Sequence, residues 1–182
     1  MPDTYNGWTN YETWAVALHL DNEEGSATHW RLEAESTLEQ SLSDYPDDIE
    51  RARADATGTL AQHLSVYADL LSAAIGAPDL GHSVYADLLA AAIEAVDWHE
   101  IARHYIDDVS VYAAGWNMPG YMPDNAPAYF ADAGLAVDYL KESAETHAEQ
   151  DDIDPPEGDW APDRDGAFGV TFNGLHYWVQ EV

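Results

Sequence analysis

Carboxylates are the side chains of this sequence that are numerous and closely spaced enough to act together. The chain of 182 residues carries 35 Asp and Glu against 6 Lys and Arg, a formal net charge of −29. A domain of this length is about 40 Å across, and 40 Å of duplex DNA holds about 24 phosphate charges. The protein's excess therefore rivals that of DNA of its own length. Such a field repels nucleic acid and anionic membranes and attracts basic surfaces.

One run of carboxylates follows a helix predicted near the C-terminus. Over residues 132–149, four acids recur at steps of four, three and four, which places them on one helix face opposite an apolar one. They are Asp138, Glu142, Glu145 and Glu149. An acidic Pro/Gly-rich loop at 151–167 continues the run. Its candidate carboxylates are Asp151, Asp152, Asp154, Glu157 and Asp159. Two interpretations stay open, a row at phosphate-like intervals or an ordinary solvated helix face.

A second acid-rich block lies in the first third of the chain, diluted by Arg31. Its candidate carboxylates are Glu23, Glu24, Glu33, Glu35, Glu39, Asp44, Asp47 and Asp48. On the functional interpretation, both sets substitute for phosphates and are the partner-binding residues. The alternative is that they, too, form a solvated surface.

Other chemistries lack the residues they need. The chain has no Cys, which excludes thiol catalysis and thiolate metal sites. His99 and His104 do not match the motif of a zinc-protease helix, because their spacing of five residues turns them about 140° apart. We therefore predict no catalytic residues, no metal site, no cofactor and no enzymatic activity.

Salt adaptation is the alternative explanation of the charge. Halophilic proteins use large negative charge for solubility at molar salt, where self-repulsion is screened. Lys141 is the only lysine, and Asp outnumbers Glu, as expected of a halophile or a GC-rich genome. Salt adaptation and mimicry of DNA can coexist.

The composition otherwise describes a folded protein. Hydrophobic residues make up 46% of the chain, with 7 Trp and 11 Tyr, which is too apolar for disorder. The N-terminus lacks the features of a signal peptide, and no stretch approaches the roughly 18 apolar residues of a membrane span. We expect a cytoplasmic protein that binds no membrane and no nucleic acid directly. The sequence leaves the oligomeric state open, with a dimer among the options.

The first 110 residues predict a helical domain. Thr9 and Glu12 match a capping box that opens a helix with an apolar stripe, which we interpret as core. The stripe consists of Tyr11, Trp14, Ala15 and Leu18. A second helix over 26–42 turns Trp30, Leu38 and Leu42 inward, and a third begins at Tyr45-Pro46. Asp97 caps a last helix, over 98–108.

An internal duplication lies within this region. Residues 65–75 (SVYADLLSAAI) and 83–93 (SVYADLLAAAI) are identical at ten of eleven positions. Gly76, Pro78 and Gly81 indicate two helices joined by a short turn. In both copies we expect the Val, Tyr, Leu and Ile side chains to be buried and the Asp to point outward.

Residues 111–182 predict a small α+β domain. A strand at 110–114 precedes a loop and the helix over 132–149, and 168–179 form a hairpin about Asn173-Gly174. Pairing Phe172 with Leu175 puts six apolar residues on one face of the hairpin. The whole chain is thus an α+β protein, with an N-terminal helical bundle (1–110) followed by a small β-α-β-β unit (111–182) that ends in a hairpin.

The opening residues 5–14 (YNGWTNYETW) resemble the start of an uncharacterised family of bacteriophages, archaeal viruses and plasmids. The acidic Leu20-Asp21-Asn22 segment and residues 87–106 are similar to that family too, so the resemblance spans about 5–110. It implies an accessory protein of a mobile genetic element, acting in the host cytoplasm. In charge and size alone, the chain is also similar to ArdA-type antirestriction proteins, which mimic DNA.

These observations lead to two functional hypotheses. The first is a DNA-mimic inhibitor, of the antirestriction or anti-CRISPR type, that occupies the basic groove of a host DNA-binding defence protein. The second is a salt-adapted halophilic adaptor without DNA mimicry. It would bind a protein partner through apolar surface, either the aromatic N-terminus or the Met118–Met122 segment.

Overall fold

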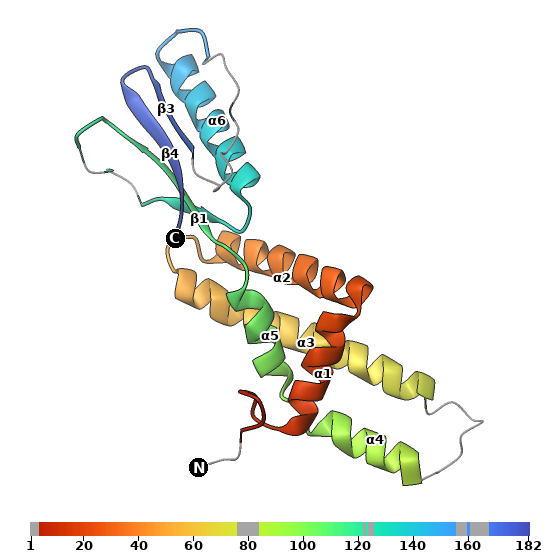
Figure 1. The fold of residues 1–182 in the computed structure, drawn as a ribbon. Coiled ribbons are helices and arrows are strands. Elements are labelled where there is room, and N and C mark those ends of the chain that lie inside the picture. The colour runs from red at the N-terminus through yellow and green to blue at the C-terminus, as the bar shows by residue number, and fades with distance from the viewer. Residues whose placement is uncertain (1–3, 76–83, 122, 124–125, 156–159, 161–167) are drawn as a thin grey trace. The chain divides into compact units, whose positions relative to one another are not determined.

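The structure is a computed structural model that describes residues 4–75, 84–121, 123, 126–155, 160 and 168–182, with the backbone alone at 71–72, 74–75 and 84–86. The predicted α+β class is confirmed, with helices toward the N-terminus and a small antiparallel sheet toward the C-terminus (Figure 1). The helices are α1 (Tyr11–Asn22), α2 (Glu24–Asp44), α3 (Ile49–Ile75), α4 (Val84–Glu94), α5 (Trp98–Asp107) and α6 (Ala133–Gln150). The strands are β1 (Tyr112–Asn117), β2 (Ala128–Phe130), β3 (Phe168–Phe172) and β4 (Leu175–Glu181). None of the described helices combines the length and apolar character needed to span a bilayer.

The chain divides into two compact units. Unit 1 comprises Met1–Thr37 and Ala54–Asp108, and unit 2 comprises Leu38–Arg53 and Val109–Val182. The division differs from the predicted one in residues 38–53, which join the C-terminal unit. Hydrogen bonds account for this difference. The Glu39 carboxylate accepts from the Ala131 N–H at 2.6 Å, and the Arg53 guanidinium donates to the Val109 carbonyl at 3.1 Å.

The start of α1 differs from the predicted capping box. Asn10, not Thr9, is the N-cap, and its Oδ1 accepts from the Thr13 N–H at 2.8 Å. The Asn10 Nδ2 also donates to the Ala95 carbonyl at 2.8 Å. Thr9 instead donates its backbone N–H to the Glu100 carboxylate at 3.0 Å. Asn and Thr are both good caps, and contacts with residues far along the chain accompany the choice of Asn10.

The buried face of α1 is not the predicted aromatic stripe. Tyr11 and Leu18 are 53% and 44% exposed, whereas Ala17 and Leu20 are buried. Thr13 is fully buried, and its hydroxyl accepts from the Asp97 N–H at 2.9 Å. The stripe prediction is wrong for Tyr11 and Leu18, because the face of α1 that is buried carries Thr13, Ala17 and Leu20.

The other helix predictions of this region largely hold. The α2 side chains Trp30, Leu38 and Leu42 are all buried, as predicted. Asp97 is the N-cap of α5 and accepts from the Glu100 N–H at 3.0 Å, which confirms that cap. The third helix starts later than predicted, at Ile49. The side chain of the preceding residue, Asp48, accepts a hydrogen bond from the Arg51 N–H in its first turn.

The duplicated segments are helical, but the predicted burial is wrong for the described Val, Tyr and Leu side chains, whereas Ile93 is partly buried. Residues 65–75 end α3, and the second copy lies almost wholly in α4. Val66 and Leu70 are 51% and 65% exposed, and Leu88 is 61% exposed. Periodicity assigns these residues to the apolar faces of α3 and α4, but burial needs a second layer, and no described element buries them. The predicted turn at 76–82 lies outside the described residues.

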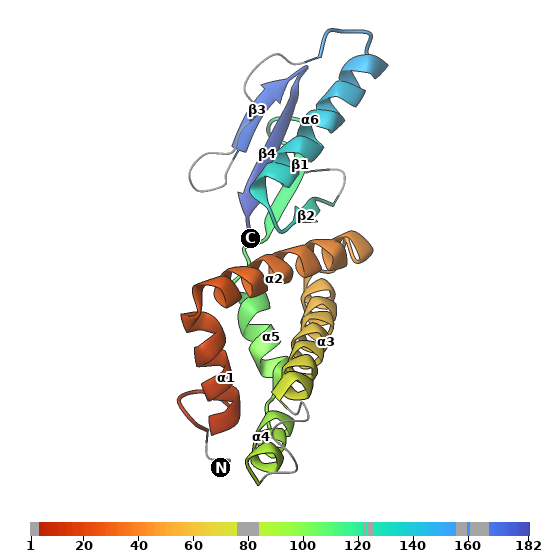
Figure 2. The same ribbon diagram turned by 90° about the vertical axis from the view of Figure 1, so that its right-hand side faces the viewer.

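Unit 2 is built on a four-stranded antiparallel sheet in the order β2-β1-β4-β3, with α6 across one face (Figures 1 and 2). The hairpin turns at Asn173 and Gly174, both with positive φ, and pairs Phe172 with Leu175 as predicted. The six predicted apolar residues of the hairpin contribute to the core beneath α6. They are Phe168, Val170, Phe172, Leu175, Tyr177 and Val179.

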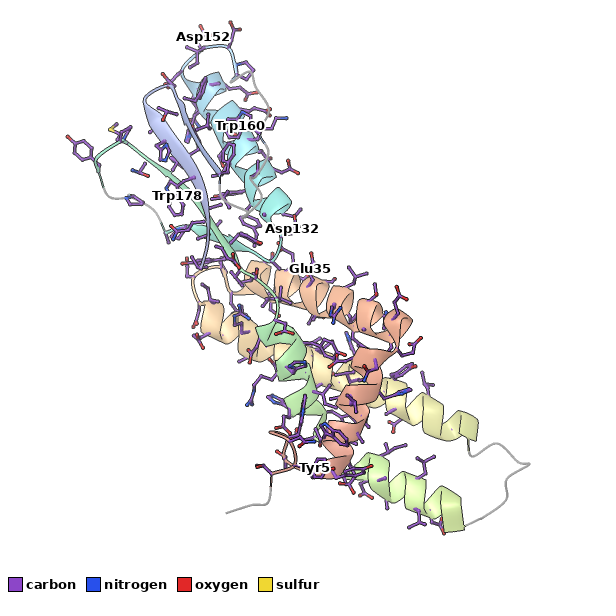
Figure 3. All side chains as sticks on the ribbon, in the orientation of Figure 1. Tyr5, Glu35, Asp132, Asp152, Trp160 and Trp178 are labelled. Carbon is purple, nitrogen blue, oxygen red and sulfur yellow. The ribbon has the colours of Figure 1, made fainter. Side chains whose placement is uncertain are left out.

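The predicted β-α-β-β order lacks one strand, because β2 precedes α6 and pairs with β1. A strand of three residues is too short to show a periodic pattern. On the sheet face away from α6, Trp178 lies between two glycines of the neighbouring strands, Gly115 and Gly169. A Cβ at Gly115 would lie 2.9 Å from the Trp178 ring, so the indole occupies the space that the glycine leaves. Figure 3 shows Trp178 and Trp160 on opposite sides of this sheet.

Candidate functional site

The α6 helix presents the predicted carboxylates on one exposed face. Its N-cap is Asp132, whose Oδ1 accepts from the Leu135 N–H at 2.9 Å. Its buried residues are Ala136, Val137, Leu140, Ala144 and Ala148. The opposite side carries four exposed carboxylates, here called the α6 row, namely Asp138, Glu142, Glu145 and Glu149. No member of the row forms an ion pair with any residue that the structure describes.

The spacing of charges in the α6 row can be compared with the spacing of phosphates in a nucleic-acid strand. With a rise of about 1.5 Å per residue, the row spans about 16 Å and places a carboxylate every 5.5 Å or so. One strand of duplex DNA places a phosphate about every 3.4 Å along the axis. The row therefore has about 60% of the linear charge density of one strand. Chemically, it can attract cationic side chains that are spaced along a line.

Further carboxylates extend the row beyond the C-terminal end of α6. Asp151 is the C-cap residue, and its carboxylate accepts from the Asn173 amide at 2.6 Å. Asp152, at φ 52°, and Asp154 are exposed. Asp132 and Asp152 mark the two ends of the helix in Figure 3. The structure thus brings seven predicted carboxylates onto one helix and its end, while Glu157 and Asp159 lie outside the described residues.

The acid-rich block at 23–48 is not one surface. Glu23, Glu24, Glu33 and Glu35 belong to unit 1, whereas Glu39, Asp44, Asp47 and Asp48 belong to unit 2. In unit 1, the Glu23 carboxylate accepts from the Ser26 N–H at 2.7 Å at the start of α2. The Glu33 carboxylate lies 2.9 Å from His63 Nδ1. Together with Glu39 and Asp48, described above, half of the block forms hydrogen bonds that support the fold.

A hollow of about 390 Å³ in unit 2 brings several acidic residues together. Its lining includes Asp47 and Asp48 from the predicted block and Glu50, which the sequence did not single out. Tyr129 and Val182 are also part of the lining, and sequence reasoning missed both because they meet the acids only in the tertiary structure. Arg53 lines the hollow as well, so the protein's own guanidinium already lies among these carboxylates and the aromatic ring.

The N-terminal aromatic residues form a packed cluster. The Tyr5 ring lies 5.1 Å from Tyr11 and 4.9 Å from Trp14, and Tyr11 and Trp14 are 5.5 Å apart, between centroids. Asn6 and Gly7, both with positive φ, make the turn that pairs Tyr5 with Trp8. The three rings therefore contact one another in edge-on and tilted arrangements. Its outer surface remains available, since Tyr5 is 41% exposed.

His104 lies in structural contacts. Trp8 packs edge-on against His104 at 5.5 Å, and His104 Nε2 lies 3.7 Å from the Asp21 carboxylate. In the described part of the chain, no group of three or more His, Asp or Glu side chains is placed to hold a metal ion.

Two buried tyrosines have perturbed acidities. Burial raises the pKa of the Tyr105 phenol, and its hydrogen bond to Asp21, at 2.9 Å, raises that pKa further. Burial, and then the charge of Asp151, raises the pKa of Tyr177, whose hydroxyl lies 2.7 Å from His147 Nδ1. Both phenols are therefore neutral at physiological pH. Each phenol has one side-chain partner, Asp21 for Tyr105 and His147 for Tyr177.

Comparison with known proteins adds one similarity. Residues 1–78 match a family of unknown function, DUF7249. The match covers less than half of the chain. It contains the opening motif, but not residues 95–104, with which Trp8, Thr9, Asn10 and Thr13 make contact. No curated protein and no solved structure matches the chain.

Proposed function

We propose that this protein is an inhibitor that occupies the basic groove of a host DNA-binding defence protein, as antirestriction and anti-CRISPR proteins do. It would act as a binding protein without catalysis, encoded by a mobile genetic element and working in the host cytoplasm. The observation that carries the proposal is the α6 row, four exposed carboxylates in one straight line without an ion-pair partner among the described residues.

The physical basis is competition for cations. A groove that binds DNA holds Lys and Arg side chains along the path of a phosphate backbone. The α6 row and the acids Asp151, Asp152 and Asp154 present carboxylates along a comparable path. Their like charges cost the helix a few tenths of a kcal/mol per pair. A complementary groove would relieve this repulsion, so the cost in the free protein becomes a gain on binding.

The role of the second block is narrower in this proposal. Glu23, Glu33, Glu39 and Asp48 already accept hydrogen bonds or contact His63. The α6 row is therefore the principal contact with the groove. The exposed acids Glu24, Asp44 and Asp47 would add long-range attraction, which raises the rate of association.

The test is capture from nuclease-treated host lysate, with the protein immobilised, at low and at high salt. We expect DNA-binding proteins to be retained at low salt, to be released by added duplex DNA and to be lost steeply as salt rises. A variant with the α6 row neutralised (Asp138→Asn, Glu142→Gln, Glu145→Gln and Glu149→Gln) should lose the capture.

The matched control removes the same four charges from dispersed positions. It carries Glu12→Gln, Glu50→Gln, Asp55→Asn and Asp107→Asn, all on helices other than α6 and outside the duplicated segments. Capture should survive in this control, because the ordered row is intact. Equal loss in both variants, or captured proteins that duplex DNA does not displace, would refute the proposal.

A second candidate function, a salt-adapted adaptor without DNA mimicry, is favoured by exposed apolar side chains. Tyr121 and Met118 are 73% and 61% exposed in the loop after β1. Tyr11, a member of the N-terminal cluster, is 53% exposed. A partner held through these side chains should remain bound at high salt, and a Met118→Ser, Tyr121→Ser variant should release it. Loss of that partner at high salt from the unaltered protein would exclude this function.

A further inference from the structure

The α4 helix is apolar but has no buried side chain among those that the structure describes. Leu88 and Leu89 are 61% and 36% exposed, and Ala90 and Ala91 are also exposed. A helix of 11 residues is marginal by itself in water, and such helices normally gain their stability by packing an apolar face. Nothing described in this chain provides that packing along the Leu88 face.

The duplicated segment in α3 repeats the same surface. Leu70 is the counterpart of Leu88 and is 65% exposed, and the preceding Asp69, like Asp87, is exposed. Val66, one turn before Leu70, is 51% exposed. The two copies therefore agree in which apolar side chain and which carboxylate they present to solvent.

The charge around these apolar residues has a single sign. Residues 54–102 contain no Lys or Arg, and their acids include Asp69, Asp87 and Glu94. At about 100° per residue, Asp87 lies a quarter-turn or so from Leu88, and Glu94 lies on the same side as Asp87. The α4 copy thus combines an apolar strip with two carboxylates, and the α3 copy combines it with one, Asp69.

We propose that the Leu88 face of α4, and its copy about Leu70 on α3, bind a basic amphipathic helix of a partner protein. Apolar residues of that helix would cover the leucines, and its Lys or Arg side chains would lie beside Asp87 and Asp69. Charge complementarity selects this occupant over a second copy of the chain, because two chains of −29 repel each other. The inference does not depend on the α6 row, which belongs to unit 2.

The test uses the full chain and a labelled 14-residue peptide of Leu and Lys in an amphipathic helical pattern. A scrambled peptide of the same composition serves as its control. The decisive variant is Leu88→Asp, because it strengthens electrostatic attraction while it removes apolar contact. Ala90→Asp adds the same charge about 200° around the helix from Leu88 and is the matched variant.

Fluorescence anisotropy should show that Leu88→Asp lowers the affinity for the amphipathic peptide about tenfold, which is the effect of losing one apolar anchor. Ala90→Asp should leave the affinity unchanged or slightly higher, and the scrambled peptide should bind the unaltered protein about tenfold more weakly. Leu70→Asp should reduce binding further when combined with Leu88→Asp. The variant with a neutralised α6 row should retain the difference between the two peptides, so this inference and the inhibitor proposal fail separately.

Three outcomes would overturn the inference. Leu88→Asp could tighten binding as much as Ala90→Asp does, which would make the contact purely electrostatic. Sedimentation could reveal a dimer that Leu88→Asp dissociates, which would mean that a second copy covers the face. Circular dichroism could show that Leu88→Asp unfolds the protein while Ala90→Asp does not, which would mean that Leu88 is needed inside its own chain.

Discussion

Helices α6 and α4 both carry an apolar strip and exposed carboxylates, but only the strip of α6 is buried. The strip of α6 lies on the sheet, and Ala136, Leu140 and Ala144 are fully buried. The strip of α4 has Leu88 and Leu89 exposed. The comparison shows that periodicity defines which face of a helix is apolar, while burial depends on a second layer of structure.

The two helices therefore offer different kinds of surface to a partner. On α6, carboxylates dominate the exposed face, so binding should be electrostatic and should weaken with salt. On α4, apolar side chains are available beside Asp87, so salt should weaken binding less. The same acidic composition thus supports two distinct modes of recognition.

The largest expected effect on the free energy of unfolding distinguishes Leu140 of α6 from Leu88 of α4. Leu140→Ala should destabilise the protein by about 2–5 kcal/mol, because it opens a cavity between α6 and the sheet. Leu88→Ala should change the free energy of unfolding by less than about 0.5 kcal/mol, since the side chain is largely in water already. Urea denaturation of both variants measures the difference. Equal effects would show that α4 is packed as tightly as α6.

High pH should weaken the layer beneath α6. Burial raises the pKa of Tyr177, so the unfolded chain loses this proton at about pH 10 while the folded chain retains it. The contribution to stability is complete below pH 10 and declines above it, by at most about 1.4 kcal/mol per pH unit. Tyr105 in unit 1 behaves in the same way. Urea denaturation between pH 8 and 11.5 should show a shallower decline for Tyr177→Phe, and an unchanged slope would contradict the assignment.

A smaller difference in stability is expected between substitutions at the N-terminal ends of α6 and α4. Asp132→Ala removes the side chain that accepts from the Leu135 N–H and should cost about 1 kcal/mol. Asp87→Ala, in the first turn of α4, should stay within about 0.5 kcal/mol of the unaltered protein. Thermal unfolding of the two variants compares them, and a loss at Asp87 that matched the loss at Asp132 would indicate an unrecognised contact of α4.

The smallest effect has the opposite sign. Glu142→Gln should stabilise the protein by a few tenths of a kcal/mol at low salt, because Glu142 lies one turn from both Asp138 and Glu145. At about 1 M salt the gain should disappear, since the screening length falls to about 3 Å. Asp87→Asn is the control, because no acid lies three or four residues from Asp87. A destabilising Glu142→Gln would show that Glu142 has a favourable partner.

Predictions from the sequence succeeded where the signal was local. The turn at Asn173-Gly174, the Asp97 cap and the burial of Trp30 each depend on residues within a few positions of one another or on a single clear periodicity. They failed where distant residues decided. Asn10, not Thr9, caps α1, and its side chain also donates to the carbonyl of the distant Ala95. The α1 helix, which contacts α5, buries Thr13, Ala17 and Leu20 and leaves Tyr11 and Leu18 exposed.

The candidate carboxylates follow the same rule. The sequence predicted that Asp138, Glu142, Glu145 and Glu149 share a face, because helix geometry alone aligns them. It did not reveal that Glu33 contacts His63, or that Glu39 binds the Ala131 N–H, 92 residues away. The acids of the 23–48 block looked equivalent in the sequence, and only their distant partners distinguish them.

The sequence by itself determined the charge, the α+β class, most of the helices and the hairpin, because composition and short-range geometry are sufficient for these. The tertiary structure alone decided that residues 38–53 join the C-terminal unit, that β2 extends the sheet and that the duplicated leucines face solvent. These features depend on which surfaces meet after the chain has folded, and residues that meet across long separations carry no local signal of their partners.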